Sequence, residues 1–423
     1  MIREKSRVEA KSFVGPKESH TSVHDMLRSI RKILAPKRFL PRYIIQTPLK
    51  KALARVVAEE IRAKFDSPLF DESLRDGFAI AQDVIMGSDR AVTFELVGET
   101  GAGDNLEKLL GENETWKVMT GGIVPGNCTH VIPQEWCAIK DKKITIDSNR
   151  LAGPRFIKRK GSEFKKNSLI AGIGELISPA FLTGIADCGW SRAHVYGRPR
   201  VCFCCTGKEL VEANSTPESA QKISSNQYLL NALIEQHGCV AHDYGIVGDE
   251  AKAVEDYFLF SLQGTFDLVL TTGGTGGGAF DLVEKGFVDA GGTVTCNSID
   301  LRPGKSLIAG EKEGTLYIGL PGPPSAVYTV FLEIVAPLLM AMRGVNADWP
   351  HCISAVTSED IVTKTRGSLL IKEGVLTFEE GGCKVRKVRQ GEGSNCNILI
   401  APGRDVISVG EKVEIHLRGP CFM

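Results

Sequence analysis

The glycine-rich segment between Phe266 and Asp281 constrains the fold of this chain more than any other part of the sequence. It reads FDLVLTTGGTGGGAFD, so a short apolar run leads into a loop with five glycines among eight residues. Glycines let backbone N–H groups approach phosphate oxygens closely and adopt positive φ without a Cβ penalty. A strand that ends in such a loop predicts a site for a phosphorylated ligand, whereas a glycine-rich turn without a ligand is the alternative for the loop taken alone.

Groups that suit an anionic ligand lie close to this loop in the sequence. Asp281 closes the loop, the segment Arg302-Pro303-Gly304-Lys305 follows it, and then comes Gly319-Leu320-Pro321-Gly322-Pro323-Pro324. One region therefore gathers backbone donors, a carboxylate and two cations. This neighbourhood favours the phosphate-binding interpretation.

Two other phosphate-binding loops are alternatives. Gly274, Gly276 and Ala279 satisfy the dinucleotide fingerprint G-x-G-x-x-A after a strand. These glycines lie deep in the chain, however, and Asp300, which ends a later apolar run, leads into an Arg-Pro-Gly-Lys turn that the fingerprint does not explain. A P-loop needs Gly-Lys-Ser/Thr after its glycines, and here Gly278 is followed by Ala-Phe-Asp.

The composition limits the class of protein. A chain of 423 residues is long enough for roughly two to four domains. Lys plus Arg equals Asp plus Glu at 51 each, so the overall charge indicates neither a nucleic acid partner nor an anionic membrane. The twelve cysteines are scattered without a Cys/His cluster of zinc-site spacing, which is typical of reduced, mostly buried thiols in a cytosolic protein.

The N-terminal residues and the length of the apolar runs predict a soluble protein. The first twenty residues are polar and charged, without the apolar stretch of a signal peptide. No run of about 18 apolar residues occurs in the sequence, so no membrane-spanning helix is expected. We therefore expect a cytoplasmic protein with no membrane association.

Hydrophobic periodicity predicts the order of the elements. Helical spacing favours one helix from Ser22 to Pro36, a second from Thr47 to Ala63, and a third from Pro179 to Cys188. Short alternating runs between Asp66 and Lys143 predict an all-β insertion. From Arg198 strands alternate with amphipathic helices, which predicts a mostly parallel sheet whose ligands collect beyond the carboxyl ends of its strands.

The fold class expected is therefore α/β plus all-β domains in one multidomain chain. The tail after the apolar helix that follows Pro323 returns to a β pattern and predicts a small barrel. The expected division is a polar N-terminal tail (1–20), a helical and linker domain (21–65 with 149–196), an inserted β domain (66–148), an α/β domain (197–345) and a C-terminal β-barrel (346–423).

Several motifs, taken in order, resemble the MoeA family, the molybdopterin molybdenumtransferases whose relatives include the E domains of gephyrin and Cnx. The resemblance covers the chain from about residue 22 to its C-terminus. The motifs that carry it are Pro68-Leu69-Phe70-Asp71-Glu72-Ser73-Leu74-Arg75-Asp76-Gly77-Phe78-Ala79, Thr120-Gly121-Gly122-Ile123-Val124-Pro125, Arg198-Pro199-Arg200-Val201, Cys205-Thr206-Gly207-Lys208-Glu209-Leu210, Ser225-Asn226, the glycine loop with Asp281, Arg302 to Lys305, and Gly319 to Pro324.

The resemblance implies a reaction and an architecture. Members of this family transfer molybdate to adenylylated molybdopterin, with Mg²⁺-dependent cleavage of the pyrophosphate linkage and release of AMP. They are elongated homodimers with a central molybdopterin-binding α/β domain, and the ligand cleft forms between that domain and the inserted domain of the other chain. Other cofactor-biosynthesis proteins and molybdoenzymes are further possible partners.

The same resemblance assigns roles to particular residues. The carboxylates expected to act in catalysis are Asp76 from the partner chain, Asp249, Asp281 and Glu209, and Asp249 and Asp281 are expected to hold the metal. The residues expected to bind the pterin, its phosphates or molybdate are Thr120, Thr206, Gly273, Gly274, Thr275, Gly276, Gly278, Arg302, Lys305, Ser298 and Ser325.

The sequence departs from the family pattern where molybdate is expected to bind. A serine of the glycine loop, a lysine before R-P-G-K, an asparagine and a further serine are replaced by Gly276, Ser298, Pro323 and Ala326. The oxyanion is left with Arg302 and Lys305, and with Ser298 or Ser325 as hydroxyl donors. Each lost charge-assisted hydrogen bond costs about 1.5–3 kcal/mol.

These departures leave a second function open. A divergent paralogue would bind molybdopterin as a carrier, as a regulator or as a handler of another oxyanion. An adenylyltransferase of the MogA type is a third hypothesis, because that family shares the α/β domain. It lacks the inserted β domain and the C-terminal barrel, so the architecture distinguishes it.

Overall fold

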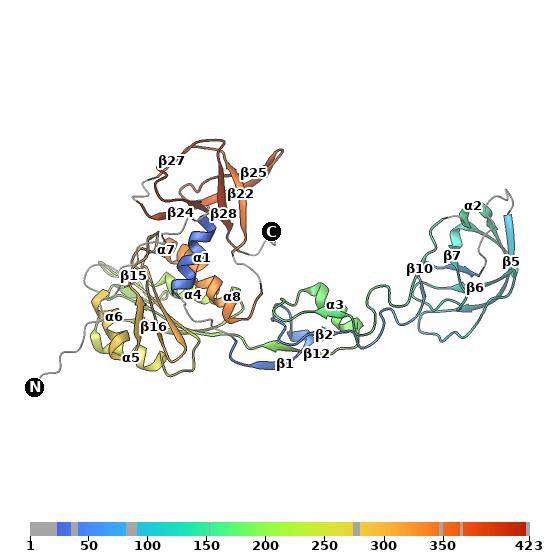
Figure 1. Cartoon of the computed structure of the whole chain (residues 1–423), viewed down its shortest axis with the longest axis horizontal. Helices are drawn as coiled ribbons and strands as arrows, with labels where there is room; N and C mark the ends of the chain where they lie inside the picture. The colour runs from blue at the N-terminus through green and yellow to red at the C-terminus, as the bar shows by residue number, and fades with distance from the viewer. Residues whose placement is uncertain are drawn as a thin grey trace, which may run out of the picture. The chain divides into compact units, whose positions relative to one another are not determined.

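The computed structural model describes residues 23–34, 41–81, 91–151, 153–273, 280–346, 350–363 and 367–419 (Figure 1). The chain divides into two compact units. One contains residues 1–45 and 196–423, and the other contains residues 46–195.

A six-stranded sheet forms the centre of the first unit, in the order β16-β13-β17-β21-β20-β18. The first four of these strands run parallel, and β20 and β18 are antiparallel to their neighbours. Their bounds are β13 Arg200–Thr206, β16 Val240–Val247, β17 Leu268–Thr272, β18 Thr293–Cys296, β20 Ile308–Lys312 and β21 Thr315–Leu320. All residues of β17 and β21 are buried, as expected for strands covered on both faces.

Helices cover both faces of this sheet. Their bounds are α4 Ser225–Gln236, α5 Ala251–Ser261 and α6 Phe280–Asp289. Alternate strand residues enter two separate cores: Phe203 and Leu270 pack with α4, while Cys202 and Val269 pack with α5 and α6. The predicted alternation of strands and helices after Arg198 is confirmed, and it brings the ends of β13, β17 and β21 to one edge of the sheet.

One long apolar helix passes through the core of the first unit. It consists of α7 Pro324–Val330, a π-helical turn η3 Phe331–Val335 and α8 Ala336–Met342. By length and composition this helix could cross a membrane, which the sequence analysis did not expect, but 78% of it is buried inside the protein. Because most of its residues are buried, we interpret it as a core helix. The first helix, α1 Val23–Leu34, adds Leu27 and Ile30 to the same core.

A closed β-barrel completes this unit. The strands β24, β25, β22, β28 and β26 pair in that order, and β26 pairs back with β24. Their bounds are β22 Cys352–Thr357, β24 Leu369–Glu379, β25 Gly382–Lys387, β26 Cys396–Ile400 and β28 Lys412–Leu417, with β19 Leu301–Arg302 added beside β24. Two short ladders join β23 Ile361–Val362 to β27 Val406–Ile407 and β14 Leu210–Val211 to β15 Lys222–Ile223. The predicted C-terminal barrel is confirmed.

The second unit contains the predicted all-β insertion. Its main sheet has the order β7-β4-β6-β5-β9-β8, with bounds β4 Gly77–Ile80, β5 Ala91–Thr100, β6 Glu114–Val118, β7 His130–Pro133, β8 Cys137–Lys140 and β9 Lys143–Asp147. The remaining pieces are the ladders β1 Ile44–Pro48 with β12 Arg192–Tyr196, β2 Ile61–Arg62 with β11 Leu169–Ala171 and β3 Glu72–Ser73 with β10 Ile157–Lys158, and the short helices η1 Leu49–Lys51, η2 Gln134–Trp136, α2 Ser148–Leu151 and α3 Pro179–Asp187.

The helix predicted from Thr47 to Ala63 is wrong. This stretch contains β1, η1 and β2. Its apolar residues pair with distant segments instead: Val56 bridges Leu176, and Val57 bridges Val195. Pairing with strands from beyond residue 168 thus overrides the local helical pattern. The helix predicted from Pro179 is confirmed as α3, whereas the exact division into domains stays a prediction.

The cysteines behave as the composition predicts. Every cysteine among the described residues is free, and most are buried. Burial raises the pKa of Cys202 and of Cys239 to about 12. These thiols are therefore protonated core residues rather than nucleophiles.

Candidate functional site

A pocket of about 510 Å³ lies at the carboxyl edge of the parallel sheet. It is lined by the ends of β13, β17 and β21 and by the first residues of α4 and α7. The lining residues are Thr206, Glu209, Leu210, Lys222, Ile223, Ser224, Ser225, Asn226, Thr272, Gly273, Gly322, Pro323 and Pro324. This is the edge at which the sequence predicts a ligand, and it brings together three of the predicted residues: Thr206, Glu209 and Gly273.

The first glycine of the loop is required for two reasons, its positive φ and the close approach of Thr206. Gly273 has φ +88°, and a Cβ added there would lie 2.4 Å from the carbonyl oxygen of Thr206. Thr206 in turn donates its hydroxyl to the carbonyl of Thr272, 3.1 Å away. The ends of β13 and β17 therefore touch through backbone atoms, which only glycine permits.

Asn226 provides an unsatisfied polar atom at this pocket. Its Nδ2 donates to the Gly322 carbonyl at 2.8 Å and to Thr272 Oγ1 at 3.4 Å. Its Oδ1 is buried and accepts no hydrogen bond from any residue that the structure describes. Because buried polar atoms are nearly always satisfied, this oxygen is a candidate acceptor for a polar ligand that carries a donor group. The N-terminus of α4, where Asn226 lies, also favours anionic groups.

Two carboxylates approach the turn that follows β13. Glu209 lines the pocket, and a Cβ on Gly207 (φ +151°) would lie 2.8 Å from Glu209 Oε2. Asp249 accepts a hydrogen bond from the backbone N–H of Lys208 at 3.3 Å, although it does not line the pocket itself. The structure thus places both predicted carboxylates near the same turn. Carboxylate oxygens of this kind are the ligands that Mg²⁺ prefers.

The rest of the glycine loop cannot be compared with its predictions. Gly274, Thr275, Gly276 and Gly278 lie outside the described residues. The structure describes the backbone of Asp281 as the second residue of α6, but not its side chain. The roles of these five residues remain predictions.

The residues expected to hold molybdate do not line this pocket. Ser298, Arg302, Lys305 and Ser325 are not among the residues that line the pocket. Ser298 donates its hydroxyl to the carbonyl of Lys305 at 3.1 Å, so this side chain stabilises the segment from Ser298 to Lys305. Arg302 keeps Nε buried without a hydrogen-bond partner among the described parts of the chain. Such an atom is suited to an oxyanion.

Asp76 and Thr120 lie together in the unit of residues 46–195. The Asp76 carboxylate accepts hydrogen bonds from the backbone N–H of Thr120 at 2.7 Å and from its hydroxyl at 2.8 Å. These two bonds, the backbone one first, lower the pKa of the exposed Asp76 side chain. The carboxylate is therefore ionised at neutral pH and fixed in orientation.

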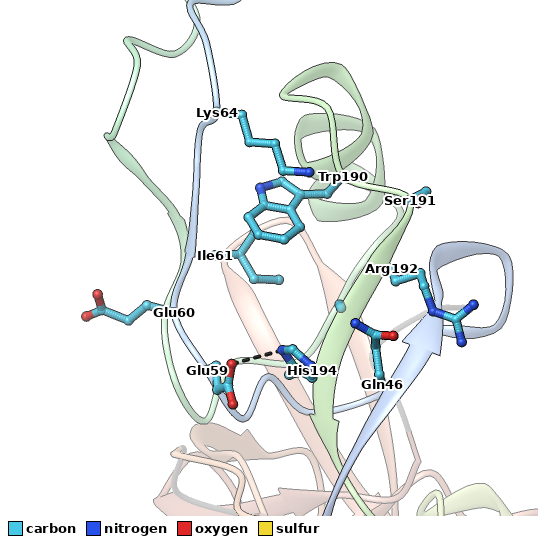
Figure 2. A pocket seen from close by; sticks show the side chains of 10 residues that line it. Gln46, Glu59, Glu60, Ile61, Lys64, Trp190, Ser191, Arg192 and His194 are labelled. Atoms are coloured by element: carbon cyan, nitrogen blue, oxygen red, sulfur yellow. Dashed lines mark ion pairs between the residues drawn. The ribbon is translucent and has the colours of Figure 1, made fainter.

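A second pocket, of about 220 Å³, lies wholly in the same unit (Figure 2). Two of its charged groups have partners: Lys64 lies 3.9 Å from the ring centre of Trp190, and Glu59 contacts His194 at 2.9 Å. No predicted site residue lines it. The pocket at the sheet edge is therefore the better candidate site.

Sequence reasoning missed several lining residues of the sheet-edge pocket. Thr272 could have been found, because it is the last strand residue before the glycine loop. Asn226 belongs to a family motif but was not given a role. Lys222 and Ile223 reach the pocket through the two-residue ladder with β14, and no pattern in the sequence indicates so short a pairing.

Comparisons with known proteins agree with this geometry. A family described as the MoeA N-terminal region (domain I and II) matches residues 21–189, and one described as a probable molybdopterin binding domain matches residues 202–341. The chain is 27% identical over 398 residues to a molybdopterin molybdenumtransferase of Staphylococcus aureus, covering 92% of this chain and 94% of that protein. It is 29% identical over 388 residues to the enzyme of the same name from Haemophilus influenzae, covering 88% and 94%.

The fold is also similar to that of a solved structure. The molybdopterin biosynthesis MoeA protein of Pyrococcus horikoshii superposes with a TM-score of 0.73 and 25% identity. The match covers 92% of this chain and 98% of that one. The similarity therefore extends over both units and includes the inserted sheet and the barrel.

Proposed function

The chain belongs to the MoeA family and is a transferase of molybdenum cofactor biosynthesis, and from this premise we propose that it inserts molybdate into adenylylated molybdopterin and releases AMP. The proposal includes cleavage of the pyrophosphate linkage with Mg²⁺ as cofactor. It also includes a cytoplasmic homodimer as the active form. An adenylyltransferase of the MogA type does not fit, because the chain has both the inserted sheet and the barrel.

The single observation that carries the proposal is the buried side-chain oxygen of Asn226, a residue that lines the sheet-edge pocket. Among the described residues, this oxygen has no hydrogen-bond partner, and Gly273 brings the start of the loop backbone against Thr206. A helix N-terminus favours the binding of a pyrophosphate, and the N-terminus of α4 lies at this edge of the sheet. The amino groups of a pterin or an adenine are suitable donors for the Asn226 oxygen.

The carboxylates near the pocket fit a divalent metal. Asp249 accepts a hydrogen bond from the Lys208 backbone close to Glu209, and Asp281 is the second residue of the helix after the glycine loop. We propose that Asp249 and Asp281 hold Mg²⁺ and that Glu209 orients the attacking water. When bound, the metal neutralises charge on the pyrophosphate oxygens.

The Asp76 carboxylate completes this arrangement in our proposal. It is ionised and oriented by Thr120, as a group that acts on a metal or a water must be. We assign it to the cleft of the partner chain, as the family architecture implies. The homodimer is therefore part of the proposed mechanism and not only of its assembly.

Arg302 and Lys305 are the proposed oxyanion ligands. Arg302 has a buried Nε without a partner among the described residues, and Lys305 is exposed nearby in the chain. Ser298 cannot offer its hydroxyl proton freely, because it already donates to the Lys305 carbonyl. Molybdate is therefore expected to meet fewer donors here than in a pocket that carries a lysine at this position.

Restoring that lysine tests the function directly. We expect Ser298→Lys to tighten molybdate binding roughly tenfold or more, because a hydrogen bond to a charged group contributes about 1.5–3 kcal/mol. Affinity for the adenylylated pterin should change little. The measurement is calorimetric titration with molybdate in the presence of the nucleotide ligand, at two salt concentrations, since exposed charges are screened by salt.

Thr293→Lys is the matched control. It adds the same charge on β18, five positions earlier, at an exposed residue. If wild type binds molybdate tightly and Ser298→Lys adds nothing, the substitution is neutral for the function. If neither form binds molybdate, the transferase proposal fails and the carrier or regulatory paralogue replaces it.

A further inference from the structure

A cluster of two histidines and one cysteine lies where α1 meets the barrel. His24 comes from the first turn of α1, Cys352 begins β22, and His416 lies in β28. One candidate ligand atom from each lies within 4.8 Å of the other two. Cys352 and His416 are direct cross-strand partners in the antiparallel ladder of β22 and β28, which explains why these two side chains meet.

The distances suit coordination of one small cation. His24 Nδ1 lies 3.0 Å from His416 Nε2. Two imidazole nitrogens bound tetrahedrally to one Zn²⁺, each at about 2.0–2.1 Å, lie about 3.3 Å apart. A shift of a few tenths of an ångström therefore admits the ion. The two rings are nearly perpendicular, with an interplanar angle of 87°.

A buried carboxylate fixes the tautomer of His416. Its Nδ1 lies 2.7 Å from Glu333 Oε2, and both side chains are fully buried. Because a carboxylate only accepts, Nδ1 carries the proton, and Nε2 faces the cluster with its lone pair. Asn397 Nδ2 also donates to Glu333, at 2.6 Å. Histidines that bind zinc are usually oriented by a carboxylate in this way.

The backbone of His24 is also fixed. The N–H groups of Val23 and His24 donate to Glu414 Oε2 at 2.9 and 3.1 Å. Glu414 lies on β28, two residues before His416. Figure 1 shows α1 lying beside the barrel end that carries β28. The N-terminus of α1 is thus held at the strand that supplies the second histidine.

From this geometry we propose that His24, Cys352 and His416 form a site for Zn²⁺ that joins α1 to the barrel. Imidazole and thiolate ligands suit zinc, whereas Mg²⁺ prefers oxygen ligands, so the site is distinct in its chemistry from the carboxylates at the sheet edge. Binding forms a zinc–sulfur bond and releases the thiol proton to solvent. His24 binds through Nδ1 with its proton on Nε2, and water takes the fourth position.

The site goes beyond the proposed function, because none of its residues lines the sheet-edge pocket. Two of its three ligands, His24 and His416, lie 392 residues apart in the chain. The spacing of cysteines and histidines in the sequence could not indicate it. Bound Zn²⁺ is expected to cross-link α1 to β28 and so to stabilise their contact.

Cobalt titration of the full-length chain tests the site. After treatment with a chelator, wild type should bind Co²⁺ with a thiolate-to-cobalt charge-transfer band in the near ultraviolet. Zn²⁺ should remove this band stoichiometrically, and excess Mg²⁺ should leave it. Zinc should also raise the Tm of wild type, because it binds only the folded state.

Variants assign the band to the cluster. Cys352→Ser, at an exposed position, should abolish the band, weaken zinc binding by at least about 100-fold and remove the Tm shift. Cys383→Ser changes a half-buried thiol of the same barrel and should retain all three properties. His24→Ala should behave as Cys352→Ser does. Absence of the band in wild type, or its retention in Cys352→Ser, would overturn the proposal.

Discussion

Replacing Gly273 by alanine is expected to lower kcat/KM for AMP release by at least about 100-fold, since a displacement of about 1 Å at a positioning loop can cost that much. The added Cβ would lie 2.4 Å from the Thr206 carbonyl oxygen, so the loop must move away from the end of β13. The residue also has φ +88°, where a side chain is strained. Activity and unfolding in urea are to be measured on the same sample.

Gly264→Ala separates the effect of backbone strain from the effect of the contact with Thr206. Gly264 has φ +77°, but a Cβ there would have no atom within 4 Å. This variant should lose about 1–2 kcal/mol of stability through backbone strain while keeping its activity. A folded Gly273→Ala protein with nearly wild-type activity would show that the contact between the two strand ends does not position the ligand.

The second large effect concerns Asp76 and Asp281. We expect each alanine variant alone to lose AMP release almost completely, because both carboxylates are proposed to act in one cleft. Mixing the two inactive variants should restore about a quarter of wild-type activity, since half the dimers are then mixed and each has one intact cleft. The measurement is AMP release after subunit exchange.

The control carries both substitutions in one chain, mixed with wild type under the same conditions. No recovery in the first mixture, despite demonstrated exchange of subunits, would place Asp76 and Asp281 of one chain in the same cleft. Sedimentation as a monomer at micromolar concentration would remove the composite cleft altogether.

The sequence predicts the α/β part well because its signals are local. Apolar runs such as VCFCC and LVLTT are long enough to indicate buried strands, and the glycine loop marks the edge of the sheet where the pocket lies. The region from Thr47 to Ala63 is misread because its apolar residues pair with Leu176 and Val195, more than 100 residues away. A periodic pattern cannot report a partner at that distance.

The candidate site is predicted in part for the same reason. Thr206, Glu209 and Gly273 follow strands directly, so their meeting follows from parallel pairing. Arg302 was expected among the ligand-binding residues, and no pattern indicated that its Nε would be buried without a partner among the described residues. The cluster of His24, Cys352 and His416 depends on how α1 docks, which side-chain packing decides.

The central claim is that this chain couples molybdate insertion to cleavage of the adenylylated pterin. The most direct measurement is the release of AMP by purified protein from adenylylated molybdopterin, with Mg²⁺ present and with molybdate either added or withheld. We expect AMP only when molybdate is added, and much less in the Asp281→Ala variant. AMP release that is independent of molybdate, or no release with molybdate and Mg²⁺ both present, would contradict the claim.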